Sequence, residues 1–266
     1  MKVGYVPVLQ ILRDLYVQPR GMQRFQKYVA TLTGGTQDVV LPIGVANPMA
    51  KDHAVAKIDE LLALGAETIG AAAAANANER LERIPLAFSS ASAGGTAAEG
   101  EIKASVVLAD DVGGGWTNRY TTETSVRFPR RGALKRPFAT ALVWTSESPT
   151  RERLRQEVLA AIYRVAYQQR FGLPATLASM LEQEGLAGVF ADARPSLATD
   201  ELNAARDIIA RLGAEPAYPL AFASMYGDAA ADQLGYRALG LPPRAGFEVA
   251  LAGALERRIE PVRALE

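Results

Sequence analysis

The stretch from Asp110 to Arg119 (DDVGGGWTNR) holds two adjacent carboxylates, three consecutive glycines and a group of polar and aromatic side chains. Two carboxylates can divide into acid and base roles or hold a divalent cation. Because adjacent residues of an extended chain point to opposite sides, we expect only one of the two, Asp110, to face a site. The alternative is that both carboxylates solvate the turn before the glycines.

The three glycines, Gly113 to Gly115, allow the backbone to approach a ligand closely or to move as a lid. They do not form a known phosphate-binding fingerprint, because the chain contains neither GxxxxGK[ST] nor GxGxxG. An ordinary surface loop is the alternative interpretation of this run.

His53 is the only histidine of the chain, and there is no cysteine. Any Ser-His-Asp arrangement must therefore use His53, while thiolate nucleophiles, disulfides and Cys-ligated zinc are excluded. A bound metal ion would be held mainly by carboxylates, which favours Mg²⁺ or Mn²⁺. The sequence leaves open whether a metal is bound.

The position of His53 supports two interpretations. On a helix, His53 shares its face with Lys57 and Glu60, which is typical of an exposed histidine. Against this, Asn47 and Pro48 predict the start of that helix, and a helix N-terminus attracts anions. We therefore count Asn47 as a candidate substrate-binding residue and His53 as a candidate for proton transfer near neutral pH.

A second group of candidate residues follows the glycines. Trp116 and Tyr120 offer flat apolar area with a polar group, and Arg119 offers a bidentate fork for a carboxylate. We predict that these three residues and Asn118 bind the substrate. Basic side chains further along favour an anionic substrate, and they are Arg127, Arg130, Arg131, Lys135 and Arg136. A solvated basic hairpin or a subunit interface is the alternative.

Apolar runs and turn residues predict alternating strands and helices up to about residue 146. The expected strands cover residues 2–9, 38–46, 84–88, 101–109, 120–128 and 138–145, and residues 67–75 are expected to be a short strand that continues into a helix. Amphipathic helices are expected over residues 22–33 and 48–64, the second ending at Gly65. If the strands are parallel, their carboxyl ends bring Asn47, Asp110 and the residues after 145 to the edge where open α/β sheets bind ligands.

From Ser148 onward the pattern is helical. Ser148 and Pro149 predict the start of a helix that Gly172 ends, and further helices are expected over residues 174–186, 199–212 and 247–258. The predicted fold class is α/β or mixed α+β, with a sheet-containing N-terminal half and a mostly helical C-terminal half. No linker-like composition separates the halves, so we expect one globular unit over residues 1–266. The alternative is an α/β part (1–146) followed by a helical part (147–266).

The overall charge excludes some partners. Lys and Arg together number 29, as do Asp and Glu, so the formal net charge is zero and nucleic acid is not an expected partner. The N-terminus lacks the apolar segment of a signal peptide, and no apolar run approaches the ~20 residues needed to span a bilayer. We expect a cytoplasmic protein without a membrane partner, and the low net charge is compatible with a homo-oligomer.

These residues predict an enzyme, a hydrolase or a lyase, that acts on a small, polar, anionic molecule by carboxylate and histidine acid–base chemistry, with or without a metal ion. The predicted catalytic residues are His53, Asp110 and Glu123. The alternative is a non-catalytic ligand-binding or scaffold protein in which residues 116–135 form an oligomer interface. A concave pocket shared by the candidate residues would favour the enzyme.

Overall fold

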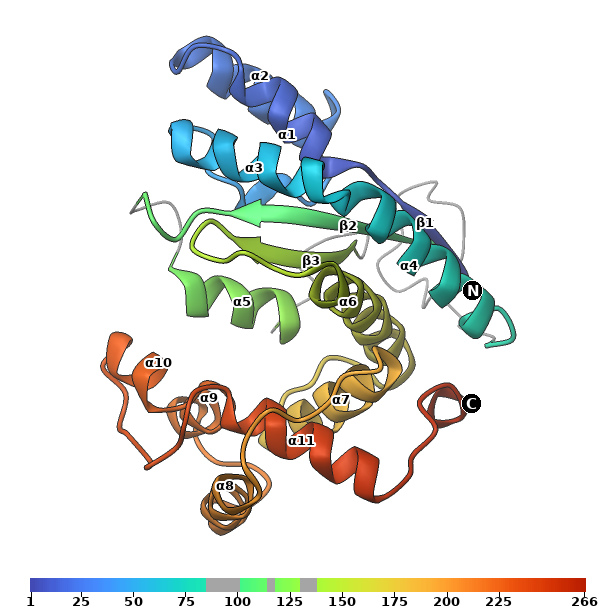
Figure 1. Ribbon diagram of the computed structural model, residues 1–266, viewed down its shortest axis with the longest axis vertical. Coiled ribbons are helices and arrows are strands. Elements are labelled where there is room, and N and C mark those ends of the chain that lie inside the picture. The colour runs from blue at the N-terminus through green and yellow to red at the C-terminus, as the bar shows by residue number, and fades with distance from the viewer. Residues whose placement is uncertain (85–100, 114–117, 130–137) are drawn as a thin grey trace.

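The computed structural model describes residues 1–84, 101–113, 118–129 and 138–266 (Figure 1). The sheet part contains β1 (Lys2–Tyr5), α1 (Val8–Tyr16), α2 (Met22–Thr33), the 3₁₀ turn η1 (Ile43–Val45), α3 (Asp52–Leu64), α4 (Ala66–Leu81), β2 (Glu101–Ala109), α5 (Arg119–Arg127), β3 (Phe138–Trp144) and α6 (Arg151–Phe171). The helical part contains α7 (Leu177–Phe190), α8 (Thr199–Arg211), α9 (Tyr218–Tyr226), α10 (Asp228–Gln233), α11 (Ala245–Glu256) and the 3₁₀ turn η3 (Arg263–Leu265).

The three described strands form one parallel sheet in the order β1-β2-β3. β1 ends where Tyr5 lies beside Ala104, whereas β2 and β3 stay in register up to Ala109 and Trp144. β2 is buried along almost its whole length, as a strand covered on both faces should be. The carboxyl ends of β2 and β3 therefore lie side by side, as the predicted site requires.

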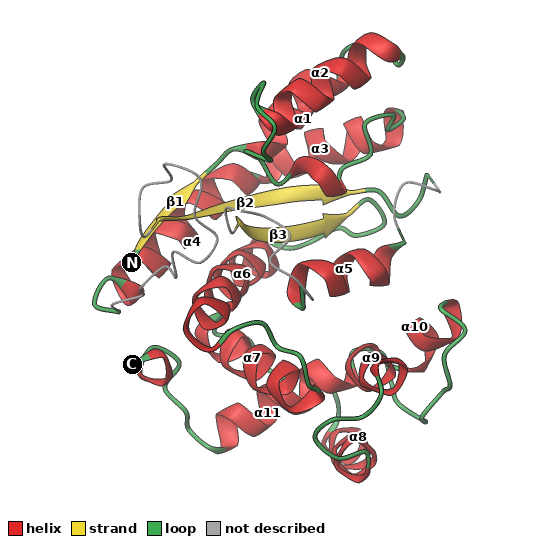
Figure 2. Ribbon diagram, turned by 180° about the vertical axis from the view of Figure 1, so that it is seen from behind, coloured by secondary structure: helices red, strands yellow, loops and turns green. Residues whose placement is uncertain are grey.

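Helices α4 and α6 pack against each other and against the sheet, α4 on β1 and β2 and α6 on β2 and β3 (Figure 2). Gly70 makes the contact of α4 with β1 close, because any side chain there would collide with the ring of Tyr5. Helix α6 also contacts α7, which packs along α11 (Figure 1). Helix α6 thus connects the sheet to the C-terminal helices.

Two clusters of buried apolar side chains hold these layers together. The first surrounds the sheet and includes Tyr163 and Phe190, whose ring centroids are 5.1 Å apart. The second lies among α7 to α11, and α7 contributes to both, with Phe190 in the first and Leu177 in the second. Residues 147–266 contain no strand, so the predicted mixed α/β fold with a mostly helical C-terminal half is confirmed. The expectation of a single globular unit stays a prediction.

The predicted strand over residues 120–128 is wrong, because Arg119–Arg127 form helix α5. Asn118 caps this helix, and its Oδ1 accepts a hydrogen bond from the N–H of Thr121 at 3.1 Å. One turn apart, Glu123 and Arg127 form a buried ion pair of 2.9 Å. These interactions outweigh the weak strand preference of the β-branched and aromatic residues on which the prediction depended.

Residues 38–46 do not form a strand either. They form a loop with one 3₁₀ turn, in which the carbonyl of Ile43 accepts a hydrogen bond from the hydroxyl of Tyr28 at 3.0 Å. Their apolar character has another cause, since the loop passes through the core and Ile43 and Ala46 are fully buried. Helix α3 consequently begins at Asp52 rather than at residue 48, whereas Gly65 ends it as predicted.

Other boundaries differ less from the expected ones. β1 is shorter than expected and stops at Tyr5. Residues 67–75 are helical throughout as part of α4, in which Asn78 accepts a hydrogen bond from the N–H of Val3 at 2.8 Å. Ile84 belongs to no strand, and the rest of the expected strand 84–88 lies outside the described residues. The predicted C-terminal helices are present, with ends shifted by at most four residues.

Candidate functional site

Asp110 and His53 form a hydrogen-bonded pair at the carboxyl end of β2. Asp110 follows β2 directly and is 5% exposed, and His53 is the second residue of α3, with a side chain that is 31% exposed. His53 Nε2 lies 2.9 Å from Asp110 Oδ1. The structure therefore brings two of the predicted catalytic residues into contact, and His53 is half-buried rather than on an outward polar face.

Several donors hold the carboxylate of Asp110. Its Oδ1 accepts hydrogen bonds from the N–H groups of Val112 and Gly113, at 3.2 and 3.0 Å, and from the hydroxyl of Thr145 at 3.0 Å. Burial raises the pKa of Asp110, but the hydrogen bonds from Gly113, His53 and Thr145 outweigh it and keep the pKa below its usual value. Because an ionised carboxylate only accepts, His53 Nε2 carries the hydrogen and Nδ1 is the basic nitrogen of the neutral ring.

Gly113 packs directly against this pair. A Cβ at this position would lie 2.7 Å from Asp110 Oδ2 and 2.8 Å from His53 Cε1, and Cβ atoms do not approach other atoms so closely. The first glycine of the run therefore allows the backbone to contact the pair closely. Gly114 and Gly115 lie outside the described residues.

Asp111 belongs to a neighbouring cluster, although it shares the hydroxyl of Thr145 with Asp110. Its Oδ2 accepts hydrogen bonds from the hydroxyl of Ser146 at 2.7 Å and from Arg119 Nη1 at 3.1 Å, and Arg119 also pairs with Glu147. Thr145 Oγ1 lies 3.0 Å from a carboxylate oxygen of each aspartate, so its single hydrogen bonds to one of them at a time. The two carboxylates thus serve different partners.

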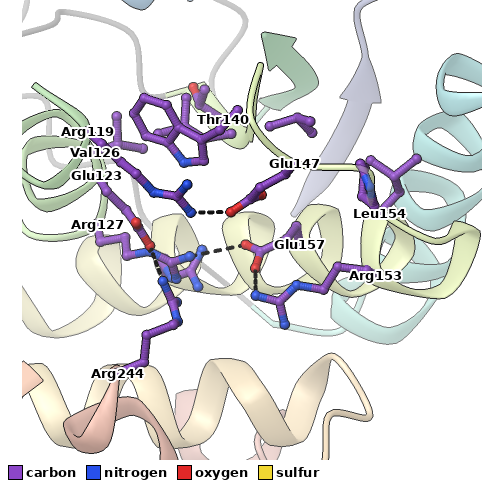
Figure 3. Close-up of a pocket in the computed structure, with 15 residues that line it drawn as sticks. Arg119, Glu123, Val126, Arg127, Thr140, Glu147, Arg153, Leu154, Glu157 and Arg244 are labelled. Carbon is purple, nitrogen blue, oxygen red and sulfur yellow. Dashed lines mark hydrogen bonds and ion pairs between the residues drawn. The ribbon is translucent and has the colours of Figure 1, made fainter. Parts of the chain in front are cut away.

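Glu123 lies in a different environment from His53. It is 3% exposed, and its Oε1 accepts hydrogen bonds from Arg127 Nε at 2.9 Å and Arg244 Nη1 at 2.8 Å (Figure 3). Burial raises the pKa of Glu123, but the charges of Arg244 and Arg127 lower it to about 2. Glu123 is therefore a fixed, ionised partner of two arginines. None of its hydrogen bonds reaches Asp110 or His53.

The ion pairs of Glu123 continue around a hollow that we call the arginine cavity. Arg127 also pairs with Glu157 at 3.2 Å and Glu184 at 3.0 Å, Arg164 pairs with Glu184 at 2.8 Å, and Arg153 pairs with Glu157 at 2.6 Å. The hollow has two adjoining parts, and the charged residues that line both parts are Arg127, Arg153, Glu157, Arg164 and Arg244. Its walls come from α5 and α6 of the sheet part and from α7 and α11 of the helical part.

Arg119 lies between the aspartates at the strand ends and the arginine cavity. Its guanidinium is 5.2 Å from the centre of the Trp144 ring and lines the arginine cavity beside Glu123, while it also bonds to Asp111 (Figure 3). Burial lowers the pKa of Arg119, but the charges of Glu147, Glu123 and Asp111 raise it above its ordinary value. Arg119 therefore stays charged, with its charge balanced by carboxylates of the protein.

The remaining predicted substrate-binding residues have partners within the protein or are not described. Asn118 caps α5, and Tyr120 packs edge-on against Tyr226 with ring centroids 5.9 Å apart. The side chain of Asn47 accepts a hydrogen bond from the backbone N–H two residues later, at 2.9 Å, and does not cap α3. Outside the described residues lie Trp116, Arg130, Arg131, Lys135 and Arg136.

The sequence analysis did not identify several residues that bind the carboxylates of the Asp110–His53 pair and of the arginine cavity. Thr145 is the last residue of an expected strand, and its hydroxyl lies within hydrogen-bond distance of both carboxylates. Arg164 and Glu184 lie on helix faces that are otherwise apolar and buried, and a charge on such a face is the signal that could have identified them. Nothing in the sequence marks Arg244, which is 121 residues away from Glu123.

Arg24 is a further buried cation that the sequence did not single out. It is 2% exposed, and its Cζ lies 4.6 Å from the ring centre of Tyr16, whose hydroxyl donates a hydrogen bond to the carbonyl of Asn47 at 2.8 Å. Its Nε and Nη2 are buried, and none of the described residues accepts a hydrogen bond from them. Arg24 therefore carries unsatisfied donors close to the loop that leads into α3.

Neither a search for metal-binding groups nor comparison with known proteins indicates which reaction the protein catalyses. Within the described ranges, no group of three or more Asp, Glu or His side chains is placed to hold a metal ion. Comparison of the chain with protein-family models, curated proteins and solved structures finds no match. None of the described helices has the length and apolar character needed to cross a bilayer.

Proposed function

We propose that the protein is an enzyme, a hydrolase or a lyase, that acts on a small, polar, anionic molecule with His53 as the proton-transfer residue. The observation that carries the proposal is the 2.9 Å hydrogen bond between His53 Nε2 and Asp110 Oδ1, beside the carboxyl ends of β2 and β3. Open α/β sheets bind ligands at this edge. A buried carboxylate that fixes one ring nitrogen and leaves the other basic suits general-base catalysis.

In the proposed reaction, His53 Nδ1 removes a proton from the reacting group. In a hydrolysis this group is water, whose oxygen then attacks the substrate, and in an elimination it is a carbon next to the leaving group. Ionised Asp110 stabilises the positive charge that develops on the ring without becoming protonated itself. His53 then gives the proton to the departing group, which restores the neutral ring.

Support for an anionic substrate comes from Arg24 and the start of α3. Burial lowers the pKa of Arg24, and its buried Nε and Nη2 lack acceptors that an anion would supply. Helix α3 has no side-chain cap at Lys51, so its first backbone N–H groups are of the kind that bind anions. His53 lies in this first turn and contacts Asp110.

The proposal gives Arg119 and Glu123 other tasks than the sequence suggested. Arg119 acts as a positioning residue, because it holds Asp111 and Glu147 and its charge is already balanced. Glu123 transfers no proton in the proposed reaction, since two arginines keep it ionised. In this proposal Arg24 therefore contacts the substrate and His53 transfers the proton.

A substrate screen tests the proposal. Purified protein is assayed with panels of carboxylate esters, phosphate esters and acids that carry a leaving group on the β-carbon, and kcat is measured for the best substrate. His53→Gln and Asp110→Asn should each lower kcat about 10²–10⁴-fold, the usual contribution of a general base. Asp59→Asn is the matched control, because Asp59 lies on the same helix and pairs with the exposed Arg13. Unchanged turnover in a folded His53→Gln variant would falsify the proposal.

A second candidate is a non-catalytic ligand-binding or scaffold subunit. It is favoured by the outer face of α2, where Met22 is 68% exposed, Phe25 36% and Val29 39%. The sequence pattern places these side chains and Tyr28 on one apolar face of the helix, but of these four only Tyr28 is buried, together with Arg24. Light scattering distinguishes the candidates. An oligomer that Met22→Ser dissociates would support the scaffold, and a monomer with turnover would support the enzyme.

The cytoplasmic location and the absence of nucleic-acid and membrane partners stay predictions from composition. Cell fractionation and binding assays with duplex DNA and anionic vesicles test them.

A further inference from the structure

The ion-pair network of the arginine cavity contains one arginine more than it contains carboxylates. Its arginines are Arg127, Arg153, Arg164 and Arg244, and its carboxylates are Glu123, Glu157 and Glu184. Four positive charges thus face three negative ones. At the rim, Arg194 and Glu248 add one charge of each sign. Arg153, whose side chain is 51% exposed, accounts for this excess, so the surplus positive charge is in contact with solvent, where it attracts anions.

Several donors of the cavity have no partner in the protein. Arg164 is 7% exposed, and its Nε bonds to Glu184, but its two Nη atoms bond to none of the described residues. Arg194 is exposed at the mouth of the cavity and likewise forms no hydrogen bond or ion pair with the described residues. The larger part of the hollow has a volume of about 110 Å³, which exceeds the room that one water molecule needs.

We propose that the arginine cavity binds a small oxyanion, the carboxylate or phosphate group of an organic ligand, at a site separate from the His53–Asp110 pair. The planar guanidinium fork fits both groups in a bidentate manner. Arg164 approaches this site from α6, Arg194 from the connection between α7 and α8, and Arg244 from the start of α11. One added negative charge balances the network.

The backbone at Arg244 is consistent with this role. Its φ of 61° lies in the left-handed region, which a residue other than glycine seldom adopts. From this position its side chain enters the cavity and reaches Glu123 at 2.8 Å, as Figure 3 shows. The site is thus built from the sheet part, through α5 and α6, and from the helical part, through α11.

Binding of simple anions to the full chain tests the site. Isothermal titration should show saturable binding of inorganic phosphate or acetate but not of chloride at equal ionic strength, and the tighter of the first two identifies the group. Arg194→Gln should weaken this binding about tenfold or more, because a charge-assisted hydrogen bond is lost. Arg206→Gln is the matched control, since it removes an exposed arginine that pairs with Glu256 outside the cavity.

A variant that is expected to bind the anion more tightly distinguishes a change at the site from a loss of folded structure. Glu248 lines the cavity and accepts hydrogen bonds from the N–H and the hydroxyl of Ser196, at 2.6 and 2.9 Å. Glu248→Gln keeps an oxygen acceptor and removes a negative charge, so it should tighten phosphate or acetate binding. Damage to the fold cannot produce tighter binding.

Three outcomes overturn the inference. The first is the lack of saturable phosphate or acetate binding by the unmutated protein. The second is equal affinity in the unmutated protein, Arg194→Gln and Glu248→Gln. The third is loss of binding in His53→Gln but not in Arg194→Gln, which would move the anion to the strand ends. Normal binding in a His53→Gln variant supports the separate site, whatever its effect on turnover.

Discussion

The strand-end pair and the arginine cavity stabilise buried carboxylates in two different ways. Asp110 is held by neutral donors, two backbone N–H groups and one hydroxyl, together with the imidazole of His53. Glu123 is held by two guanidinium groups that keep their charge. Both carboxylates have a lowered pKa, but only the first has a partner that can gain and lose a proton near neutral pH.

Under the proposed function, the contrast separates a proton-transfer pair from a structural network. Neutral dipoles stabilise a carboxylate without adding a counter-charge, so the carboxylate remains able to stabilise positive charge that develops on its neighbour. In an arginine network every carboxylate is already balanced, and the loss of one arginine leaves buried carboxylates with fewer counter-charges. The two places should therefore respond differently to mutation and to pH.

The largest effect is expected from Arg127→Met. Arg127 pairs with Glu123, Glu157 and Glu184, so its removal leaves three buried carboxylates short of a partner. The free energy of unfolding, measured with urea, should fall by ~3–5 kcal/mol or more. Arg206→Met removes an exposed pair and should cost at most ~1 kcal/mol. Similar losses in the two variants would contradict a structural role for the network.

Acid should also weaken the arginine network. For both Glu123 and Glu157 burial raises the pKa, but neighbouring arginine charges outweigh it and lower the pKa from 4.5 to about 2. A carboxyl with a lower pKa in the folded state contributes its full stabilisation above the unfolded pKa and loses it as pH falls through the folded pKa. The free energy of unfolding should therefore decline between pH 4.5 and about 2.

Urea titrations at a series of pH values measure this decline, which should amount to about a few kcal/mol because each pKa unit corresponds to ~1.4 kcal/mol. Glu157→Gln should make the curve flatter in this range. An acid response that is the same in Glu157→Gln would show that other carboxyl groups cause it.

A smaller effect is expected from Gly113→Ala at the strand ends. The added methyl group would lie 2.7 Å from Asp110 Oδ2 and 2.8 Å from His53 Cε1, so the loop must shift. Overpacking of this kind costs ~1–3 kcal/mol, and the shift should also change the NMR signals of the His53 ring. Gly253→Ala is the control, because a Cβ there meets no atom within 4 Å and should stabilise α11 by up to ~1 kcal/mol. If both substitutions stabilise the protein, the close packing at Gly113 is not required.

The sequence predicted the parts of this comparison that depend on local patterns. The apolar run 101–109 placed Asp110 at the end of a strand. The expectation that only Asp110 faces a site stays a prediction, since both aspartates lie 3.0 Å from the hydroxyl of Thr145. Glycines at positions 65 and 172 marked the ends of α3 and α6, because each follows the last helical residue with a positive φ. The fold class and the presence of a polar cluster at the strand ends could therefore be predicted from the sequence.

The parts that depend on distant contacts were not predictable. Glu123 was predicted to act with His53 and Asp110, and residues 120–128 were separately predicted to be a strand, whereas this segment forms a helix in which Glu123 pairs with Arg244. One of the two interpretations of the sequence placed His53 on a polar outer face with Lys57, yet Asp110, 57 residues away at the end of β2, forms a hydrogen bond with His53. In both cases one tertiary contact outweighs the local pattern.

The smallest effect on stability is expected where the proposed effect on function is greatest. His53 is partly exposed and makes one side-chain hydrogen bond among the described residues, so His53→Gln should change the free energy of unfolding by ~1 kcal/mol or less. Glutamine can still donate to Asp110 but cannot accept and release a proton near neutral pH, so turnover should be lost while the fold stays intact. If His53→Gln instead destabilises the protein as much as Arg127→Met does, the strand-end pair is structural like the arginine network. The assignment of proton transfer to His53 would then lose its main support.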